Sequence, residues 1–158
     1  MPGLCTVIEI ISPLFDYAGF VWGDKNNTSL MHQLQVLQNR AAKVILNAPI
    51  SSSATEALIN ELGWHSLTKR RMFHRVMMAF KYLRGQIDFS FNIKSSKDVR
   101  DYNTRKKMDV RLPLAKRNWG QQKFVYSIFR DWNTLDPSIR DVTSFSLFRT
   151  KAKNVILI

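Results

Sequence analysis

The sequence predicts a mainly α-helical protein, a bundle of about six helices with one small β-hairpin between residues 109 and 124. Two observations support helices: apolar residues recur three and four positions apart over most of the chain, and glycine or proline follows several of these segments. A third supports a folded core, since hydrophobic residues make up 45% of the chain and ten are Phe. The length of 158 residues fits one domain or two small helical units.

The first half contains two early helical segments. Residues 4–22 are apolar enough for a buried helix, which Pro13 would kink or restart. The clearest pattern covers residues 29–46, where Asn27 or Thr28 is the expected N-cap and Pro49 follows the end. The apolar residues of that pattern are spaced four, three, four and three apart: Leu30, Leu34, Leu37, Ala41 and Val44.

Two further helices are expected before residue 86. Ser53 and Glu56 have the spacing of a capping box, so a short helix should begin there and end at a left-handed Gly63. A basic helix should then run from Ser66 to Arg84 and end at Gly85. Its apolar side chains are Phe73, Val76, Met77, Phe80 and Leu83.

The rest of the chain begins with a polar stretch, residues 86–108, which we interpret as a basic linker between a helical unit, 1–85, and a second unit, 109–158. Residues 109–114 alternate as a short edge strand does, with a return strand near 118–124. Helical spacing resumes over residues 122–135. A turn at Asp136-Pro137 should precede a last helix that Ser144 caps, with Phe145, Phe148, Ala152 and Val155 on one face.

The net charge of +12 is concentrated in two segments. Residues 66–84 contain six basic residues and no acid, residues 94–123 contain ten basic residues and three acids, and everything else sums to −1. Such clustering favours a polyanionic partner over a charge that only maintains solubility.

Each basic segment has two interpretations. The cations of residues 66–84 form either an ordinary solvated surface or a phosphate-binding face, and the lack of acids for i, i+4 pairs favours the second. The basic run at 105–107 fits a loop that becomes ordered on nucleic acid. Trp119 is either a stacking platform or a half-buried strand aromatic. Candidate nucleic-acid-binding residues are Arg40, Lys43, Lys69, Arg70, Arg71, Arg75, Arg105, Lys106, Lys107, Lys116, Arg117 and Trp119.

No catalytic, metal or cofactor site is expected. The acids are scattered without an Asp-Asp pair, and His32, His65 and His74 lack the spacing of helical metal ligands. A nucleophilic Cys5–His pair stays open, although the single cysteine rules out an internal disulfide. No stretch has the length of a membrane span or the pattern of a signal peptide, so we expect a nuclear or cytoplasmic protein.

Nine short blocks, in order over residues 8–153, resemble the region after the polymerase motifs in non-LTR (LINE-type, jockey-like) retrotransposon reverse transcriptases. The longest is the helix segment from Leu34 to Ile45, with its Gln38-Asn39-Arg40-Ala41 centre. The others are Pro13–Tyr17 with Val21–Gly23, Leu62–Trp64 with Leu67 and Arg70-Arg71, Phe80–Leu83, Tyr102–Arg105, Leu112-Pro113, Phe124–Tyr126, Trp132–Leu135 and Phe148-Arg149.

This resemblance implies a non-catalytic, thumb-like C-terminal fragment of an RNA-directed DNA polymerase, with residues 1–85 as the thumb-like unit. Its implied partners are RNA, DNA or an RNA–DNA hybrid and the upstream polymerase domain, with no membrane. Two residues depart from the family pattern: Asp131 replaces an apolar residue, and Asp136 stands near a more usual proline. The alternatives are a protein-interaction or structural module that packs on an absent polymerase core, an inactive relic, and an independent enzyme.

Overall fold

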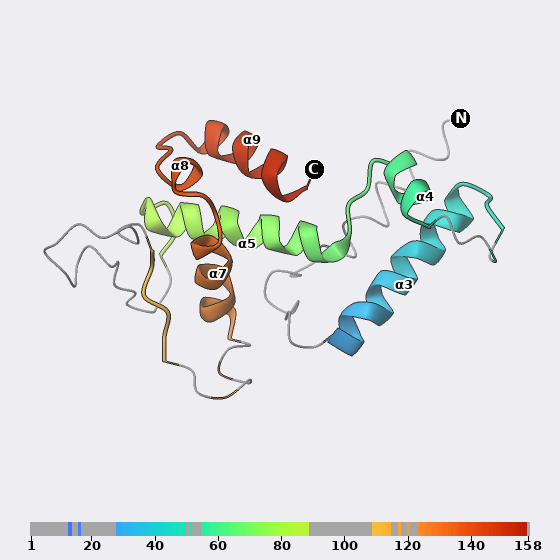
Figure 1. The fold of residues 1–158 in the computed structure, drawn as a ribbon, viewed down its shortest axis with the longest axis horizontal. Coiled ribbons are helices and arrows are strands. Elements are labelled where there is room, and N and C mark those ends of the chain that lie inside the picture. Colours follow the sequence, from blue (N-terminus) through green and yellow to red (C-terminus); the bar gives the residue numbers. More distant parts are fainter. Residues whose placement is uncertain are drawn as a thin grey trace, which may run out of the picture. The chain divides into compact units, whose positions relative to one another are not determined.

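The described residues of the chain are mainly helical, as predicted, with six helices and no strand among them (Figure 1). This computed structural model describes Pro13, Asp16, 28–49, Ser51, 55–88, 109–114, Arg117, Gly120 and 123–157. The chain divides into two compact units, Met1–Arg71 and Met72–Ile158. The predicted helices within residues 4–22 lie outside the described residues except for Pro13 and Asp16.

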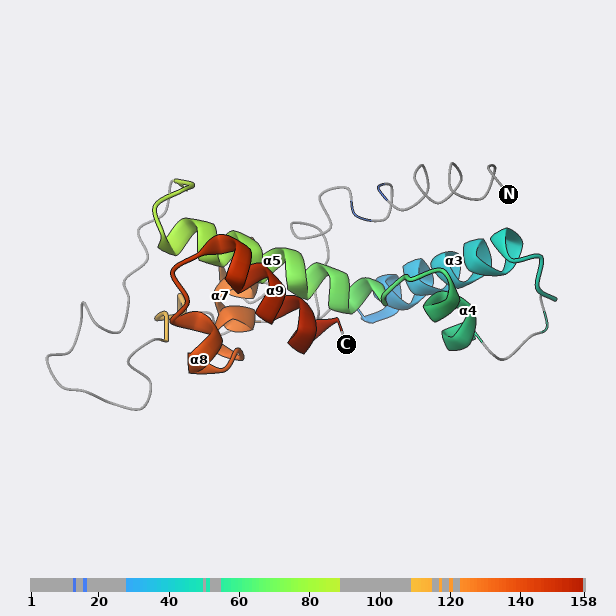
Figure 2. The same ribbon diagram turned by 90° about the horizontal axis from the view of Figure 1, so that it is seen from above.

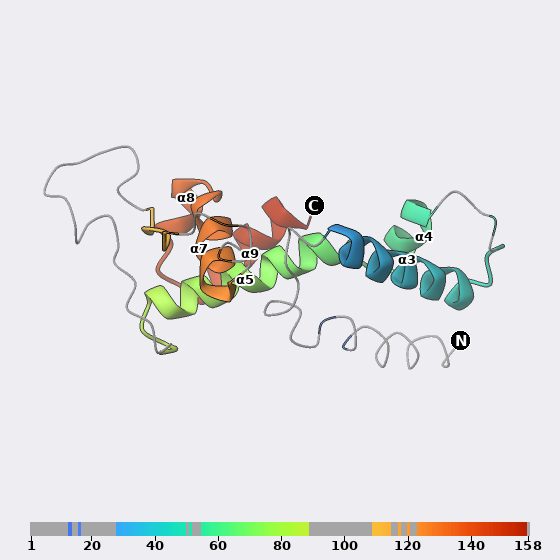
Figure 3. The same cartoon turned by 90° about the horizontal axis from the view of Figure 1, so that it is seen from below.

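Unit 1, Met1–Arg71, contains α3 (Thr28–Ile45) and α4 (Thr55–Glu61), which lie side by side (Figures 1 and 3). Ala42, Ile59 and Trp64 form its buried apolar cluster. Asn47 follows α3 with φ +51°, a left-handed conformation that asparagine tolerates. Gly63 follows α4 with φ +65°, which confirms the predicted left-handed end of that helix.

The face that α3 buries differs from the one that its apolar spacing suggests. Leu37 is 50% exposed and Val44 is 78% exposed, whereas Gln38 is fully buried. The side-chain amide of Gln38 donates to the carbonyl of His65 at 3.1 Å, and Gln35 Oε1 accepts from the backbone N–H of Leu67 at 3.0 Å. These bonds satisfy polar backbone groups just before α5, and this explains why glutamines occupy the inner face.

Unit 2, Met72–Ile158, contains most of α5 (Leu67–Leu83) together with α7 (Phe124–Asn133), α8 (Pro137–Arg140) and α9 (Phe145–Ile156). In this unit α9 runs alongside α5, and α7 crosses it (Figures 1 and 2). Phe80 stacks on Phe148 with ring centroids 4.4 Å apart, and Trp132 lies 5.6 Å from Phe148. These aromatic contacts form the centre of the larger buried core.

The boundary between the units falls after Arg71, inside α5, and not in the predicted linker at 86–108. The reason is that Val76, Met77 and Phe80 pack with α7 and α9, so most of the basic helix belongs with the C-terminal part of the chain. Only residues 86–88 of the predicted linker are described. Gly85, with φ +68°, follows α5 as predicted.

The predicted strand over residues 109–114 is not formed. The backbone N–H of Val110 donates to Asn133 Oδ1, and Asn133 Nδ2 donates to the carbonyl of Val110, both at 2.9 Å. The backbone of residues 109–114 is therefore held at Val110 by the amide of Asn133, and Val110 forms only an isolated β-bridge. Most of the predicted return strand, 118–124, lies outside the described residues.

Candidate nucleic-acid interface

The predicted basic residues that the structure describes differ in exposure. Arg40, Lys69 and Arg117 are exposed, Lys43 and Arg70 are half-buried, and Arg71 and Arg75 are buried. Five candidates lie outside the described residues, so the structure does not place them: Arg105, Lys106, Lys107, Lys116 and Trp119.

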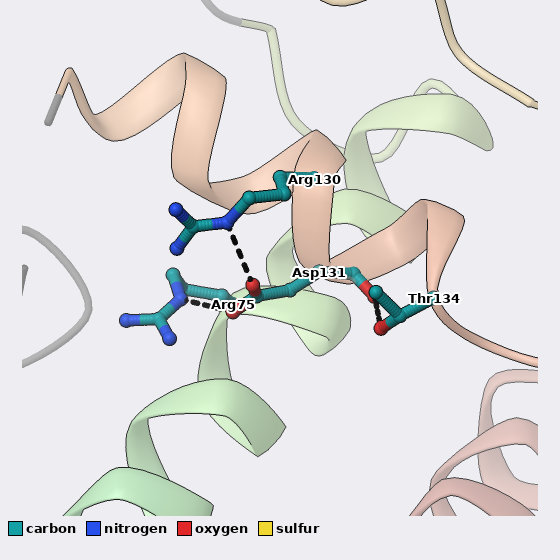
Figure 4. Close-up of polar contacts among 4 residues, drawn as sticks. All are labelled: Arg75, Arg130, Asp131 and Thr134. Carbon is teal, nitrogen blue, oxygen red and sulfur yellow. Dashed lines mark hydrogen bonds and ion pairs between the residues drawn. The ribbon is translucent and has the colours of Figure 1, made fainter. Parts of the chain in front are cut away.

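Arg75 of α5 is held by a buried ion pair to α7. Its Nε lies 2.6 Å from Asp131 Oδ2, and the two side chains are 4% and 7% exposed. Arg130 approaches the other carboxylate oxygen at 3.4 Å, so two guanidinium groups share one carboxylate (Figure 4). Asp131 is therefore the counter-charge of a core arginine.

Arg70 and Arg71, on the first turns of α5, make contacts within unit 1. Arg70 forms an ion pair with Asp16. Arg71 Nη1 donates to the thioether sulfur of Met31 at 2.6 Å. Neither side chain is presented to solvent as the predicted phosphate-binding face requires.

The prediction of a phosphate-binding face on α5 therefore fails for its central arginines, and the reason is non-local. Residues 66–84 contain no acid, but the counter-charges come from Asp16 and Asp131, which are 54 and 56 residues away from Arg70 and Arg75. A count of acids within one helix does not include carboxylates supplied by packed neighbours.

Other carboxylates of unit 2 are also engaged in structure. Asp109 accepts from Arg140 Nη1 at 2.7 Å. Asp136 caps the N-terminus of α8, where its side chain accepts from the backbone N–H of Ser138 at 2.8 Å. Hydrogen bonds to Ser138 hold the pKa of Asp136 below its ordinary value of 3.8, and the charge of Arg140 adds to this effect.

Exposed cations in unit 2 include several that the sequence argument did not select. Residues 144–158 contain three basic residues and no acid, the same signal that drew attention to 66–84. All three basic side chains, on α9, are exposed. The exposed cations of unit 2 in the described ranges are Arg84, Arg111, Arg117, Lys123, Arg149, Lys151 and Lys153.

Residues 132–135 have structural roles at each position. Trp132 and Leu135 are buried in the core, Asn133 bonds to Val110, and Thr134 Oγ1 donates to the carbonyl of Asp131 at 2.7 Å (Figure 4). This block therefore organises unit 2 and leaves few of its groups for a ligand.

Within the described part of the chain, no three His, Cys, Asp or Glu side chains lie close enough together to hold a metal ion. None of the helices there has the length and apolar character that crossing a bilayer requires. Comparison with protein-family models, with curated proteins and with solved structures finds no match to this chain.

Proposed function

We propose that this chain is the non-catalytic C-terminal part of a retrotransposon RNA-directed DNA polymerase and binds nucleic acid through unit 2. The proposed ligand is a template, a primer or their hybrid, contacted through its phosphates in the nucleus or cytoplasm. The ordered blocks shared with non-LTR reverse transcriptases support the descent. The charge distribution between the two units supports the binding.

The charge difference between the units is the observation that carries the proposal. Unit 2 contains 18 of the 24 Lys and Arg and seven of the 12 Asp and Glu, a net charge of +11. Unit 1 has a net charge of only +1. Two of these seven acids are neutralised inside the unit, because Asp131 forms a buried ion pair with Arg75 and Asp109 pairs with Arg140, whereas Asp136 keeps its charge at the surface.

A surface of this kind suits a phosphate backbone more than a base-specific contact. Neutralising phosphates releases counterions, so affinity should fall steeply with salt and depend little on sequence. The sequence has no Asp-Asp pair for two-metal chemistry, so the proposal includes no nucleotide transfer by this chain.

A salt titration of the full chain tests this proposal. Binding to an RNA–DNA hybrid, a DNA duplex and a single strand of matched length is measured by fluorescence anisotropy between about 50 and 200 mM salt. We expect micromolar binding at the lowest salt concentration. The logarithm of the binding constant should fall with the logarithm of the salt concentration with a slope of about −3 or steeper, which corresponds to three or more neutralised phosphates. Absence of binding to all three ligands at 50 mM salt contradicts the proposal.

A second candidate function is a structural module that packs on a polymerase core, and the outer face of α3 favours it. Leu30, Leu37 and Val44 are exposed and seven residues apart, so they line up along the helix. Exposed apolar rows of this kind often mark contact surfaces. Self-association or binding of an apolar dye that Leu37→Ser reduces supports it, and a monomer without dye binding contradicts it.

A further inference from the structure

Two exposed cations lie in one row along α9. Phe145, Arg149 and Lys153 are four residues apart, so they follow one flank of the helix, with about 6 Å of rise at each step. Phe148, Ala152 and Ile156 bury the neighbouring flank against the core. Arg149 and Lys153 are therefore held by a fixed helix, with both side chains in solvent.

The last turn of α5 extends this row. Lys81 Nζ lies 5.1 Å from the centroid of the Phe145 ring, one turn before Arg149. Arg84 lies over Phe80 at 5.4 Å and donates to the carbonyl of Val142 at 2.7 Å, just before α9 begins. The end of α5 and the outer flank of α9 thus place four cations near one another on one surface. We call this surface the cationic ridge, and it consists of Lys81, Arg84, Arg149 and Lys153.

The surroundings of the ridge suit phosphate and not an apolar partner. Ser146 and Thr150 lie beside Arg149 and Lys153 on α9 and both are exposed, although the Thr150 hydroxyl donates to the carbonyl of Ser146 at 3.1 Å. Hydroxyl groups are frequent phosphate contacts in nucleic-acid complexes. In the ranges that the structure describes, no carboxylate forms an ion pair with Arg149 or Lys153.

The opposite flank of α9 has a different character. Leu147, Lys151 and Val155 are also four residues apart, and Leu147 and Val155 are 50% and 61% exposed. Lys151 and Lys153 are thus both exposed, but Lys151 lies between apolar neighbours on another side of the helix. This difference within one helix provides an internal control.

The geometry points to the cationic ridge as the surface that contacts the phosphate backbone of a nucleic acid. This inference rests on the proposed function and places its binding surface on α9 and the end of α5, away from the arginines at 70, 71 and 75. The occupant is a polyanionic strand because the ridge offers successive positive charges and hydroxyls, which match a repeating phosphate.

The test compares charge-neutralising variants of the full chain. Arg149→Gln/Lys153→Gln should weaken binding to a DNA duplex at least about tenfold at low salt and reduce the log–log salt slope by about 1.8. Arg40→Gln/Lys69→Gln removes the same charge from exposed positions of unit 1 and should change affinity by less than about twofold. Within α9, Lys153→Gln should weaken binding more than Lys151→Gln.

A charge-preserving variant separates charge from folding. Arg149→Lys/Lys153→Arg should bind like the wild type, and all variants should keep the same thermal unfolding midpoint because the side chains are exposed. The ridge is not the binding surface if the ridge and unit 1 variants lose the same affinity, or if Arg149→Gln/Lys153→Gln binds like the wild type. Either result leaves the proposed function intact. A wild-type chain that binds no nucleic acid overturns both.

Discussion

The two units stabilise their helices with different chemistry. Among the described residues of unit 1 the buried apolar cluster has three members, and hydrogen bonds of Gln35 and Gln38 join α3 to the backbone at the start of α5. Unit 2 buries thirteen apolar residues around stacked aromatic rings and adds the ion pair of Arg75 and Asp131. Within the described residues, the helices of unit 2 are held by apolar and aromatic packing around a buried ion pair, whereas α3 uses buried amides on its inner face and leaves Leu37 and Val44 exposed.

The largest expected effect is in the aromatic core. Phe80→Ala removes a fully buried ring that stacks on Phe148, and should lower the free energy of unfolding by about 3–5 kcal/mol. Hydrogen exchange followed by mass spectrometry should show the greater loss of protection in residues 72–157. The control Phe80→Leu fills more of the cavity than Phe80→Ala does, so it should lower the free energy of unfolding by less. Equal loss of protection in both units contradicts the separation of their cores.

The buried ion pair gives the next effect. Asp131→Leu leaves the Arg75 guanidinium buried without its carboxylate, and should cost about 3 kcal/mol in urea unfolding. Arg75→Met/Asp131→Leu replaces both partners by apolar groups and should recover most of that loss. A double variant that is less stable than either single variant would contradict this expectation, because the ion pair would then stabilise the fold by more than the cost of removing both charges from water.

In unit 1 a smaller effect is expected from the amide network. Gln38→Leu leaves the carbonyl of His65 without its donor and should cost about 1–3 kcal/mol, with the loss of exchange protection centred on α3 and α4. Gln33→Leu, at an exposed position of the same helix, is the matched control and should stay within about 0.5 kcal/mol of wild type. Stabilisation by Gln38→Leu would mean that apolar burial outweighs the hydrogen bond.

The smallest effect concerns the cap of α8. Because the pKa of Asp136 is lowered in the folded chain, its ionised form stabilises the fold above pH 3.8, and this contribution fades as the pH falls below that value. Asp136→Asn keeps an oxygen that accepts from Ser138 but removes the charge. The thermal midpoint of this variant should lie slightly below wild type at pH 7 and approach it as the pH falls through the lowered pKa of Asp136. A constant difference across that range would exclude the carboxylate charge as the cause.

Local features of the fold could be predicted from the sequence. Gly63 and Gly85 follow helices as expected, and a break in the chain was expected at Asp136-Pro137, where the structure has a short helix in place of the predicted turn. Phe148, Trp64 and Trp132 are buried as their apolar settings indicate. These features depend on neighbouring residues, which the sequence displays directly.

Features that depend on distant partners could not be predicted in the same way. The buried face of α3 is decided by backbone groups near His65 and Leu67, so Gln38 is inside and Leu37 is outside. Arg75 is buried because it pairs with Asp131, and no rule of sequence spacing connects these two residues. The basic residues of α9 had the same local signal as those of α5, and only packing distinguishes the two helices.

The side chain of Asn133 has a consequence for how residues 109–114 meet other molecules. An extended segment with open N–H and C=O groups is a template for pairing with a second chain, and many proteins aggregate through such edges. At Val110 both groups are already occupied by one amide, which offers a donor and an acceptor that no aspartate or leucine of similar size supplies together. Asn133 thereby ties the backbone of Val110 to α7, and replacing this one side chain would release a donor and an acceptor of the segment together.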